Sequence, residues 1–152
     1  METVRTVRDM LRGRELQLYT ASPQDTVFDA LQEMARRNVG ALPVMDGARL
    51  VGIFSERDYA RKVILYGRSS REMAVSEIMS TRVAYVYPTQ TINDCMALMS
   101  KLRIRHLPVL EGKTVIGMIS MRDVVEEIIS EQDFIIEQLV NYIQTERSWV
   151  RP

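Results

Sequence analysis

The sequence GIFSERD at residues 52–58 returns, nearly unchanged, as GMISMRD at residues 117–123. In each copy an apolar run is followed by a polar run with helical character, so the stretch predicts a strand that leads into a helix. A junction of this kind that occurs twice indicates that the chain folds the same unit twice. It also indicates that the chain presents the same surface twice.

The repeat extends well beyond these seven residues. When the chain is shifted by 65 positions, residues 23–64 align with residues 88–129 without a gap. The aligned positions include the tripeptide Leu-Pro-Val, at 42–44 and 107–109, and the turn sequences Asp46-Gly47 and Glu111-Gly112. A match of this length predicts a tandem duplication.

The upstream ends of the two copies align at a different offset. VRDML at 7–11 resembles VSEIM at 75–79 at an offset of 68, so we expect three extra residues near Gly13 in the first copy. A polar linker, GRSSREM, lies at 67–73. These features predict the following organisation: repeat 1 at 5–66, repeat 2 at 73–130, and a C-terminal amphipathic helix at 131–146 with an apolar stripe formed by Phe134, Ile135, Leu139, Tyr142 and Ile143.

Each repeat is expected to fold as β-α-β-β-α, which makes the chain an α/β (α+β) protein. A short apolar strand (Leu16–Thr20 or Val83–Tyr87) leads through a proline turn to a helix capped by Thr26 or Thr91. Two strands joined by a tight turn and a second helix complete each unit as a three-stranded sheet with two helices. Neither unit is long enough to bury its apolar faces alone, so the two are expected to pack together.

Composition excludes several classes of protein. Lys plus Arg and Asp plus Glu each number 20 of 152 residues, so the net charge is zero and nothing global favours nucleic-acid binding. The longest apolar runs have the length of strands, which argues against a membrane span and favours a cytoplasmic protein. Cys95 and His106 are the only residues of their types, so we expect no disulfide and no zinc cage. Cys95 is expected to be a small buried residue on a helix.

The pattern Ser-x-x-Asp at the repeated junction has two interpretations. It is a capping box, in which the serine oxygen accepts a backbone N–H and the carboxylate reaches back to the N–H of the cap residue. The same helix N-terminus can also bind an anion, and the carboxylate can accept hydrogen bonds from the vicinal hydroxyls of a ribose. The glycine three residues before each serine, Gly52 or Gly117, lets another group approach the strand closely.

The order and spacing of these motifs, met twice over residues 7–130, resemble a tandem pair of cystathionine-β-synthase-type (CBS) domains. The length of the chain is similar to that of small bacterial proteins made of one such pair. The resemblance implies that the two repeats pack about a pseudo-twofold axis into a Bateman module with two clefts. It also implies that adenine nucleotides bind there, with AMP and NAD as the foremost candidates and ADP, ATP or S-adenosylmethionine as further ones. No other cofactor is expected.

The resemblance also assigns roles to residues of this sequence. The aspartate of Ser-x-x-Asp would hold the ribose, residues before Leu-Pro-Val would reach phosphate, and the segment before the first helix would contact adenine. Further apolar candidates are Val39, Tyr85, Val86 and Tyr87. The candidate nucleotide-binding residues are Tyr19, Thr20, Ala21, Gly40, Ala41, Pro43, Ser55, Arg57, Asp58, Arg61 and Lys62 in the first copy, and Ile104, Arg105, His106, Pro108, Ser120, Arg122 and Asp123 in the second.

The two clefts are not expected to be chemically equal. The chain after Asp58 is basic, whereas the chain after Asp123 is acidic. Arginine and histidine also precede the second Leu-Pro-Val, where the first copy has glycine and alanine. We therefore hypothesise that Arg105, His106 and the basic run after Asp58 serve a phosphate-bearing ligand. The alternative is that Arg61 and Lys62 belong to a solvated helix face.

Three functions remain in competition. The first is a regulatory module that senses adenine nucleotides and acts, as a homodimer, on an effector protein that the sequence does not reveal. The second is a ligand-free dimerisation or interaction scaffold, in which the Ser-x-x-Asp motifs are only caps. The third, an enzyme, is disfavoured because the sequence shows no nucleophile elbow, P-loop or metal cluster and holds a single histidine.

Overall fold

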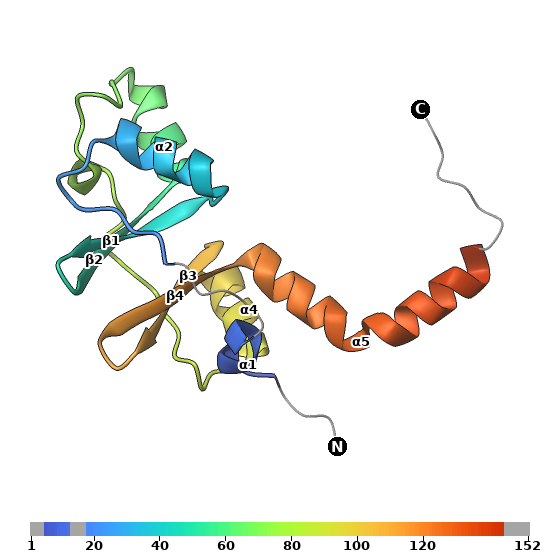
Figure 1. Ribbon diagram of the computed structural model, residues 1–152. Helices are drawn as coiled ribbons and strands as arrows, with labels where there is room; N and C mark the ends of the chain where they lie inside the picture. Colours follow the sequence, from blue (N-terminus) through green and yellow to red (C-terminus); the bar gives the residue numbers. More distant parts are fainter. Residues whose placement is uncertain (1–4, 13–17, 145–152) are drawn as a thin grey trace.

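The computed structural model describes residues 5–12 and 18–144 (Figure 1). Its first half contains α1 (Val7–Arg12), α2 (Val27–Arg37), β1 (Ala41–Asp46), β2 (Arg49–Ser55), α3 (Glu56–Lys62) and the short 3-10 helices η1 (Ile64–Tyr66) and η2 (Val75–Glu77). Its second half contains α4 (Ile92–Leu102), β3 (His106–Glu111), β4 (Thr114–Ser120) and α5 (Met121–Gln144). The mixed fold of two similar halves confirms the predicted fold class.

The two β-hairpins are copies of one another down to their register. In β1–β2, Ala41 pairs with Ser55, and in β3–β4, His106 pairs with Ser120. Each hairpin carries one irregularity at the same place, after the valine of Leu-Pro-Val. The turn glycines Gly47 and Gly112 have φ values of 61° and 63°, a region that favours glycine. Figure 1 shows the two hairpins one above the other, with α2 beyond the upper one and α1 and α4 beside the lower one.

The third strand expected in each sheet is reduced to a single bridge. Ala21 pairs with Val44 and Val86 pairs with Val109, both in parallel, and each sheet otherwise has two strands. The prolines explain this difference, because a longer parallel ladder would require an N–H donor at Pro43 and at Pro108 that proline lacks. Of the predicted strand Leu16–Thr20, the first two residues lie outside the described part of the chain, as do the extra residues expected near Gly13.

The predicted helix caps are confirmed. The hydroxyl oxygen of Thr26 accepts the N–H of Asp29 at 3.1 Å, and that of Thr91 accepts the N–H of Asp94 at 3.0 Å. Both helices then end in a left-handed residue, Asn38 with φ 54° and Arg103 with φ 55°. These matched ends lead the chain into β1 and β3 at equivalent positions.

Each hydrophobic core is completed by a segment from the beginning of the other repeat. Val7, Met10 and Leu11 of α1 pack in the core around α4, β3 and β4, whereas residues 73–78 pack in the core around α2, β1 and β2. The backbone follows the same exchange, because the N–H of Val7 donates to Gln90 O and the N–H of Val75 donates to Asp25 O, both at 2.8 Å. The likeness of VRDML to VSEIM therefore reflects equivalent places in the two halves.

The C-terminal helix α5 runs without interruption across the predicted boundary at residue 130 and projects from the body (Figure 1). Leu139 and Ile129 on it are 57% and 50% exposed. The side chains of Phe134, Ile135, Tyr142 and Ile143, expected in its apolar stripe, lie outside the described residues, as do residues 145 and 146. Among the described residues, no helix combines the length and apolarity that crossing a membrane requires.

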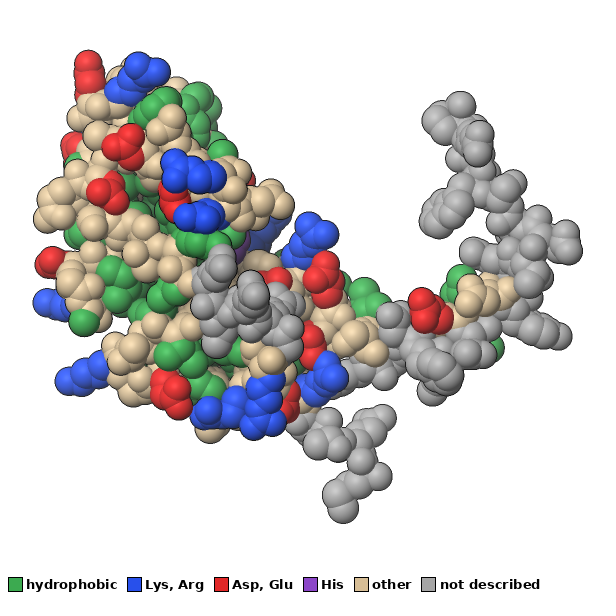
Figure 2. All heavy atoms as spheres, in the orientation of Figure 1, with side chains coloured by type: hydrophobic (Ala, Val, Ile, Leu, Met, Phe, Trp, Pro, Cys, Tyr) green, Lys and Arg blue, Asp and Glu red, His purple; other side chains and the backbone are tan. Residues whose placement is uncertain are grey.

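The face of the molecule in Figure 2 carries positive and negative side chains interspersed with apolar ones. The one cysteine, Cys95, lies on α4 and is fully buried in the core, as expected. Burial raises the pKa of its thiol to about 11, which keeps the thiol protonated at neutral pH. Its role is therefore packing.

Candidate functional site: two pockets between the repeats

Two pockets lie where the repeats meet. The first, which we name the basic pocket, encloses about 500 Å³. The end of β2, helix α3, the segment at 80–84 and the residues that lead into β3 form its walls. It is lined by Gly40, Ile53, Ser55, Glu56, Arg57, Asp58, Arg61, Lys62, Ser80, Arg82, Ala84, Ile104, Arg105 and His106.

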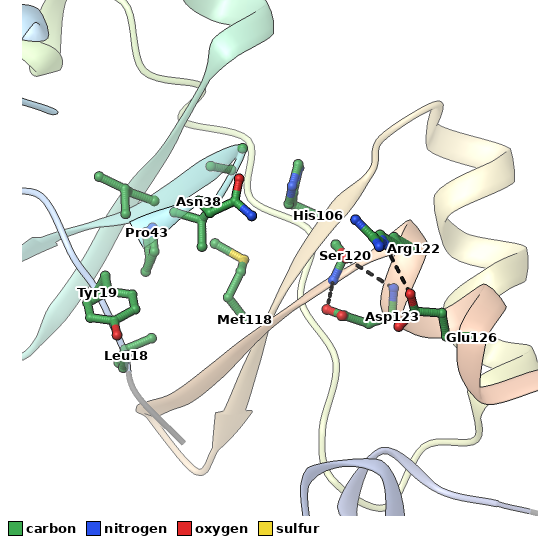
Figure 3. A pocket seen from close by; sticks show the side chains of 14 residues that line it. Leu18, Tyr19, Asn38, Pro43, His106, Met118, Ser120, Arg122, Asp123 and Glu126 are labelled. Carbon is green, nitrogen blue, oxygen red and sulfur yellow. Dashed lines mark hydrogen bonds and ion pairs between the residues drawn. The ribbon is translucent and has the colours of Figure 1, made fainter. Parts of the chain in front are cut away.

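The second pocket, which we name the acidic pocket, encloses about 510 Å³ (Figure 3). Figure 3 shows an apolar side with Leu18, Tyr19, Pro43 and Met118 and a polar side at the start of α5. It is lined by Leu18, Tyr19, Asn38, Val39, Gly40, Ala41, Leu42, Pro43, His106, Met118, Ser120, Arg122, Asp123 and Glu126.

The charges of the two linings differ in sign. Five Lys and Arg side chains line the basic pocket, against the two carboxylates Glu56 and Asp58. In the acidic pocket, Arg122 faces the two carboxylates Asp123 and Glu126, and its Nε lies 3.0 Å from Glu126 Oε1. The asymmetry expected from sequence is therefore present in space in part. Arg61 and Lys62 of the basic run after Asp58 line the same pocket as Arg105 and His106, whereas Arg68 and Arg71 of that run do not.

The first Ser-x-x-Asp corner forms a capping box at the start of α3. The hydroxyl oxygen of Ser55 accepts the N–H of Asp58 at 3.2 Å, and Oδ2 of Asp58 accepts the N–H of Ser55 at 3.0 Å. Asp58 is nevertheless part of the basic pocket and is the one buried charged side chain among the residues whose burial the structure describes. The capping role and a ligand-binding role are therefore compatible at this corner.

The second corner repeats these bonds at the start of α5. Oδ2 of Asp123 accepts the N–H of Ser120 at 2.8 Å, and Ser120 Oγ accepts the N–H of Asp123 at 3.1 Å. Figure 3 shows both residues beside the acidic pocket, together with Arg122 from the same turn of α5 and Glu126 from the following turn. Each repeat thus places the aspartate of its helix-capping box in one pocket.

The close approach expected at Gly52 is made by the protein itself. A Cβ at this position would lie 2.6 Å from Met79 Sδ and 3.0 Å from the carbonyl oxygen of Ser80. The backbones of Ile53 and Ser80 exchange two hydrogen bonds beside it, at 2.8 and 2.9 Å. The segment that approaches β2 at Gly52 is therefore the one that also carries Ser80 into the basic pocket.

Gly40 and His106 belong to both pockets. A Cβ at Gly40 would lie 3.3 Å from Cε1 and from Nε2 of His106, so the imidazole lies against the backbone at this point. Burial lowers the pKa of His106, the nearby Asp123 raises it by a smaller amount, and Arg105 lowers it further. A neutral imidazole at neutral pH therefore stands between the two pockets.

Most of the candidate residues from sequence lie in one pocket or the other. Thr20, Ala21 and Pro108 line neither. Thr20 is exposed, whereas Ala21 and Pro108 are buried, since Ala21 bonds to β1 and Pro108 lies inside β3. Of the apolar candidates, Val39 lines the acidic pocket, whereas Val86 is in the core and the rings of Tyr85 and Tyr87 contact each other in an edge-on arrangement.

Sequence reasoning missed several lining residues. Ser80 and Arg82 reach the basic pocket from the segment between η2 and α4, and Leu18 and Met118 form part of the apolar side of the acidic pocket. The repeat alignment carried no signal for Ser80 and Arg82, because they lie outside the ungapped match. Met118 is the middle residue of GMI in the quoted motif and was accessible to sequence reasoning by its alternation with buried residues.

The comparisons with known proteins agree with this fold. The CBS domain family model matches residues 4–64 and 75–130. The protein therefore belongs to the CBS domain family, as a tandem pair. A curated relative is the mitochondrial CBS domain-containing protein CBSX3 of Arabidopsis thaliana, 42% identical over 79% of this chain and 61% of its own length. This chain thus spans about three fifths of that relative.

Solved structures agree as well. A signal-transduction protein with CBS domains from Burkholderia ambifaria, itself assigned that role provisionally, is 47% identical and superposes with a TM-score of 0.81, covering 84% of this chain and 96% of that one. The CBS domain pair of protein MJ0100 was solved with 5'-methylthioadenosine and S-adenosyl-L-methionine. It is 21% identical, with a TM-score of 0.72 over 85% of this chain and 99% of that one, so it shows the fold.

Proposed function

We propose that this protein is a regulatory module that binds a phosphate-bearing adenine nucleotide in the basic pocket. The observation that carries the proposal is the convergence of five Lys and Arg side chains from both repeats on a cavity of about 500 Å³ that also contains Asp58. A cavity of this size suits a small ligand, and arginine side chains bind phosphate through paired hydrogen bonds. The carboxylate of Asp58 would accept the hydroxyls of the ribose.

A ligand in this pocket would contact both repeats at once. Helix α3 supplies Arg57 and Arg61, whereas the chain before β3 supplies Arg105. One direct bond already links the two repeats, because Nη1 of Arg57, a lining residue, donates to the carbonyl oxygen of Arg103 at 3.1 Å. A ligand that binds one arrangement of the repeats more tightly than another would shift the protein towards it, which is how occupancy would be signalled.

Within this proposal, AMP and NAD are the foremost ligands and ADP and ATP are further candidates, whereas S-adenosylmethionine carries no phosphate and is the candidate that the basic lining favours least. The adenosine ligands bound by the CBS pair of MJ0100 support the adenosine class. We expect a homodimer that acts on a separate effector protein. Exposed apolar side chains on α5, including Ile129 and Leu139, are consistent with a contact of this kind.

A thermal-shift panel with AMP, ADP, ATP, NAD, NADH and S-adenosylmethionine tests the proposal. A ligand present at about 100 times its dissociation constant stabilises the folded state by about 2.7 kcal/mol, which raises the melting temperature measurably. We expect at least one phosphate-bearing nucleotide to do so. No shift with any of the six would favour the ligand-free scaffold, and turnover of ATP or NAD would show an enzyme instead.

A further inference from the structure

The carboxylate of Asp58 is fully engaged within the protein. Its Oδ2 accepts the N–H and the hydroxyl of Ser55, both at 3.0 Å. Its Oδ1 accepts the hydroxyl of Ser80 at 3.3 Å and lies 3.0 Å from Nζ of Lys62. Since a carboxylate oxygen has about two acceptor sites, a ribose can bond to Asp58 only if one of these partners leaves.

Lys62 is the one charged partner of Asp58 among these, and its departure is the one that a bound phosphate would favour most. Its side chain is 43% exposed, whereas that of Asp58 is 11% exposed. The bonds from Ser55 belong to the cap of α3, so their loss would also disturb the helix. The ammonium of Lys62, which also donates to the carbonyl oxygen of Ile78 at 2.9 Å, is a flexible point charge that a phosphate in the same pocket would attract.

The second repeat provides an internal contrast. Residue 127, which aligns with Lys62, is a glutamate, and Glu127 forms an ion pair with Arg5. Glu127 is not among the residues that line the acidic pocket. An ion pair between the aspartate of the capping box and a lysine four residues later therefore occurs in the basic pocket and has no counterpart at the second corner, where that position is a glutamate.

We propose that Lys62 determines the specificity of the basic pocket by occupying the carboxylate of Asp58 until a phosphate-bearing ligand draws its ammonium away. A nucleotide brings the phosphate that Lys62 moves to, so its ribose gains access to Asp58. A nucleoside brings no such group and must compete with Lys62 for the carboxylate. This inference rests on the proposed function and adds to it a selection against unphosphorylated nucleosides.

The test is the substitution Lys62→Met, with dissociation constants for ATP and adenosine measured by isothermal titration calorimetry. The protein with Lys62 and the Lys62→Met variant are both measured in a background that carries Asp123→Asn. This substitution weakens ribose binding in the acidic pocket, and the asparagine keeps an oxygen that can cap α5. We expect Lys62→Met to weaken ATP binding about tenfold and to tighten adenosine binding about threefold to tenfold, because the net contribution of one hydrogen bond in water is of this size. Lys62→Gln, measured in the same way, replaces it if the methionine variant does not fold.

Arg61→Met is the matched control, because it removes a positive charge from the same pocket without touching Asp58. It should weaken ATP binding and leave adenosine binding unchanged. If Lys62→Met weakens ATP binding but adenosine does not bind more tightly, the role of Lys62 is overturned while the proposed function stands. If the protein with Lys62 intact does not bind ATP, AMP takes the place of ATP in this test. If it binds none of AMP, ADP, ATP, NAD and NADH, both the role of Lys62 and the proposed function are overturned.

Discussion

The two pockets are built on the same frame but differ in charge. In both, the aspartate of a helix-capping box lies at the start of a helix that follows one of the two equivalent hairpins. One turn later, the first copy has Arg61 and Lys62 where the second copy has Glu126 and Glu127. The comparison teaches that the residues common to the two copies build the frame of the pockets, while the residues that differ determine the charge of each lining.

The largest effect is expected when the first copy receives the residues of the second. The double substitution Arg61→Glu and Lys62→Glu reverses two charges in the basic pocket, so we expect ATP affinity to fall by more than about 100-fold, or about 3 kcal/mol. Isothermal titration calorimetry measures this effect, and circular dichroism checks folding. If the ATP affinity of the double variant stayed within about threefold of the original, the charges of Arg61 and Lys62 would not be what distinguishes the two pockets.

A smaller effect on both pockets is expected from Gly40→Val. The new Cβ would lie 3.3 Å from the ring of His106, and the two methyl groups would force a shift in the wall that the pockets share. Overpacking of this kind costs about 1–3 kcal/mol, so thermal denaturation should show a lower melting temperature. Gly40→Ala should have a weaker effect in the same direction. An unchanged melting temperature for the valine variant would mean that the wall adapts freely.

The affinity of the basic pocket for anions should depend on pH through His106. Since burial lowers its pKa, the imidazole gains a proton only as the pH falls below about 6.5, and its charge then favours an anion. We expect the ratio of ATP affinities, original protein over His106→Gln, to rise about threefold to tenfold between pH 7.5 and pH 5.5. Taking the ratio cancels the titration of ATP itself. A ratio that does not change with pH would exclude His106 from the anion site.

The lowered pKa of His106 also determines how the free energy of unfolding depends on pH. The unfolded chain binds the proton at a higher pH than the folded chain does, so His106 contributes stability above about pH 6.5. This contribution declines as the pH falls through the folded-state pKa. A bound anion opposes the decline, because it favours the protonated imidazole in the folded protein.

The smallest effect is expected at the exposed pair Arg122 and Glu126. The side chain of Arg122 is 84% exposed and its bond to Glu126 is an i,i+4 pair, so Arg122→Ala should change the free energy of unfolding by less than about 0.5 kcal/mol. ATP binding in the basic pocket should not change. Urea denaturation and calorimetry check the two statements, and a tenfold change in ATP affinity would show that the pockets are not independent in charge.

The duplication made much of the fold predictable from sequence. Thr26 and Thr91 cap their helices as expected, and the hairpins with Gly47 and Gly112 follow from local turn chemistry. The sequence did not predict the exchange of α1 and residues 73–78 between the cores. That packing depends on contacts between segments distant in the chain, which a local pattern does not record.

The candidate site was predictable in part, for the same reason. Arg61, Lys62, Arg105 and His106 were predicted because each stands at a repeated position with an altered charge. Arg57 and Asp58 were predicted because they recur unchanged in the second copy. Ser80 reaches Asp58 from outside the aligned repeat, so its contact appeared only in the structure. The bond between Lys62 and Asp58 follows from their i,i+4 spacing on a helix and was readable in principle.

The crystal structure of the protein with ATP tests the central claim most directly. We predict that the phosphates lie in the basic pocket, within hydrogen-bonding distance of Arg105 and of Arg57 or Arg61. Phosphates located in the acidic pocket beside Glu126, or crystals grown with AMP, NAD and ATP in turn that hold none of the three, would contradict the account.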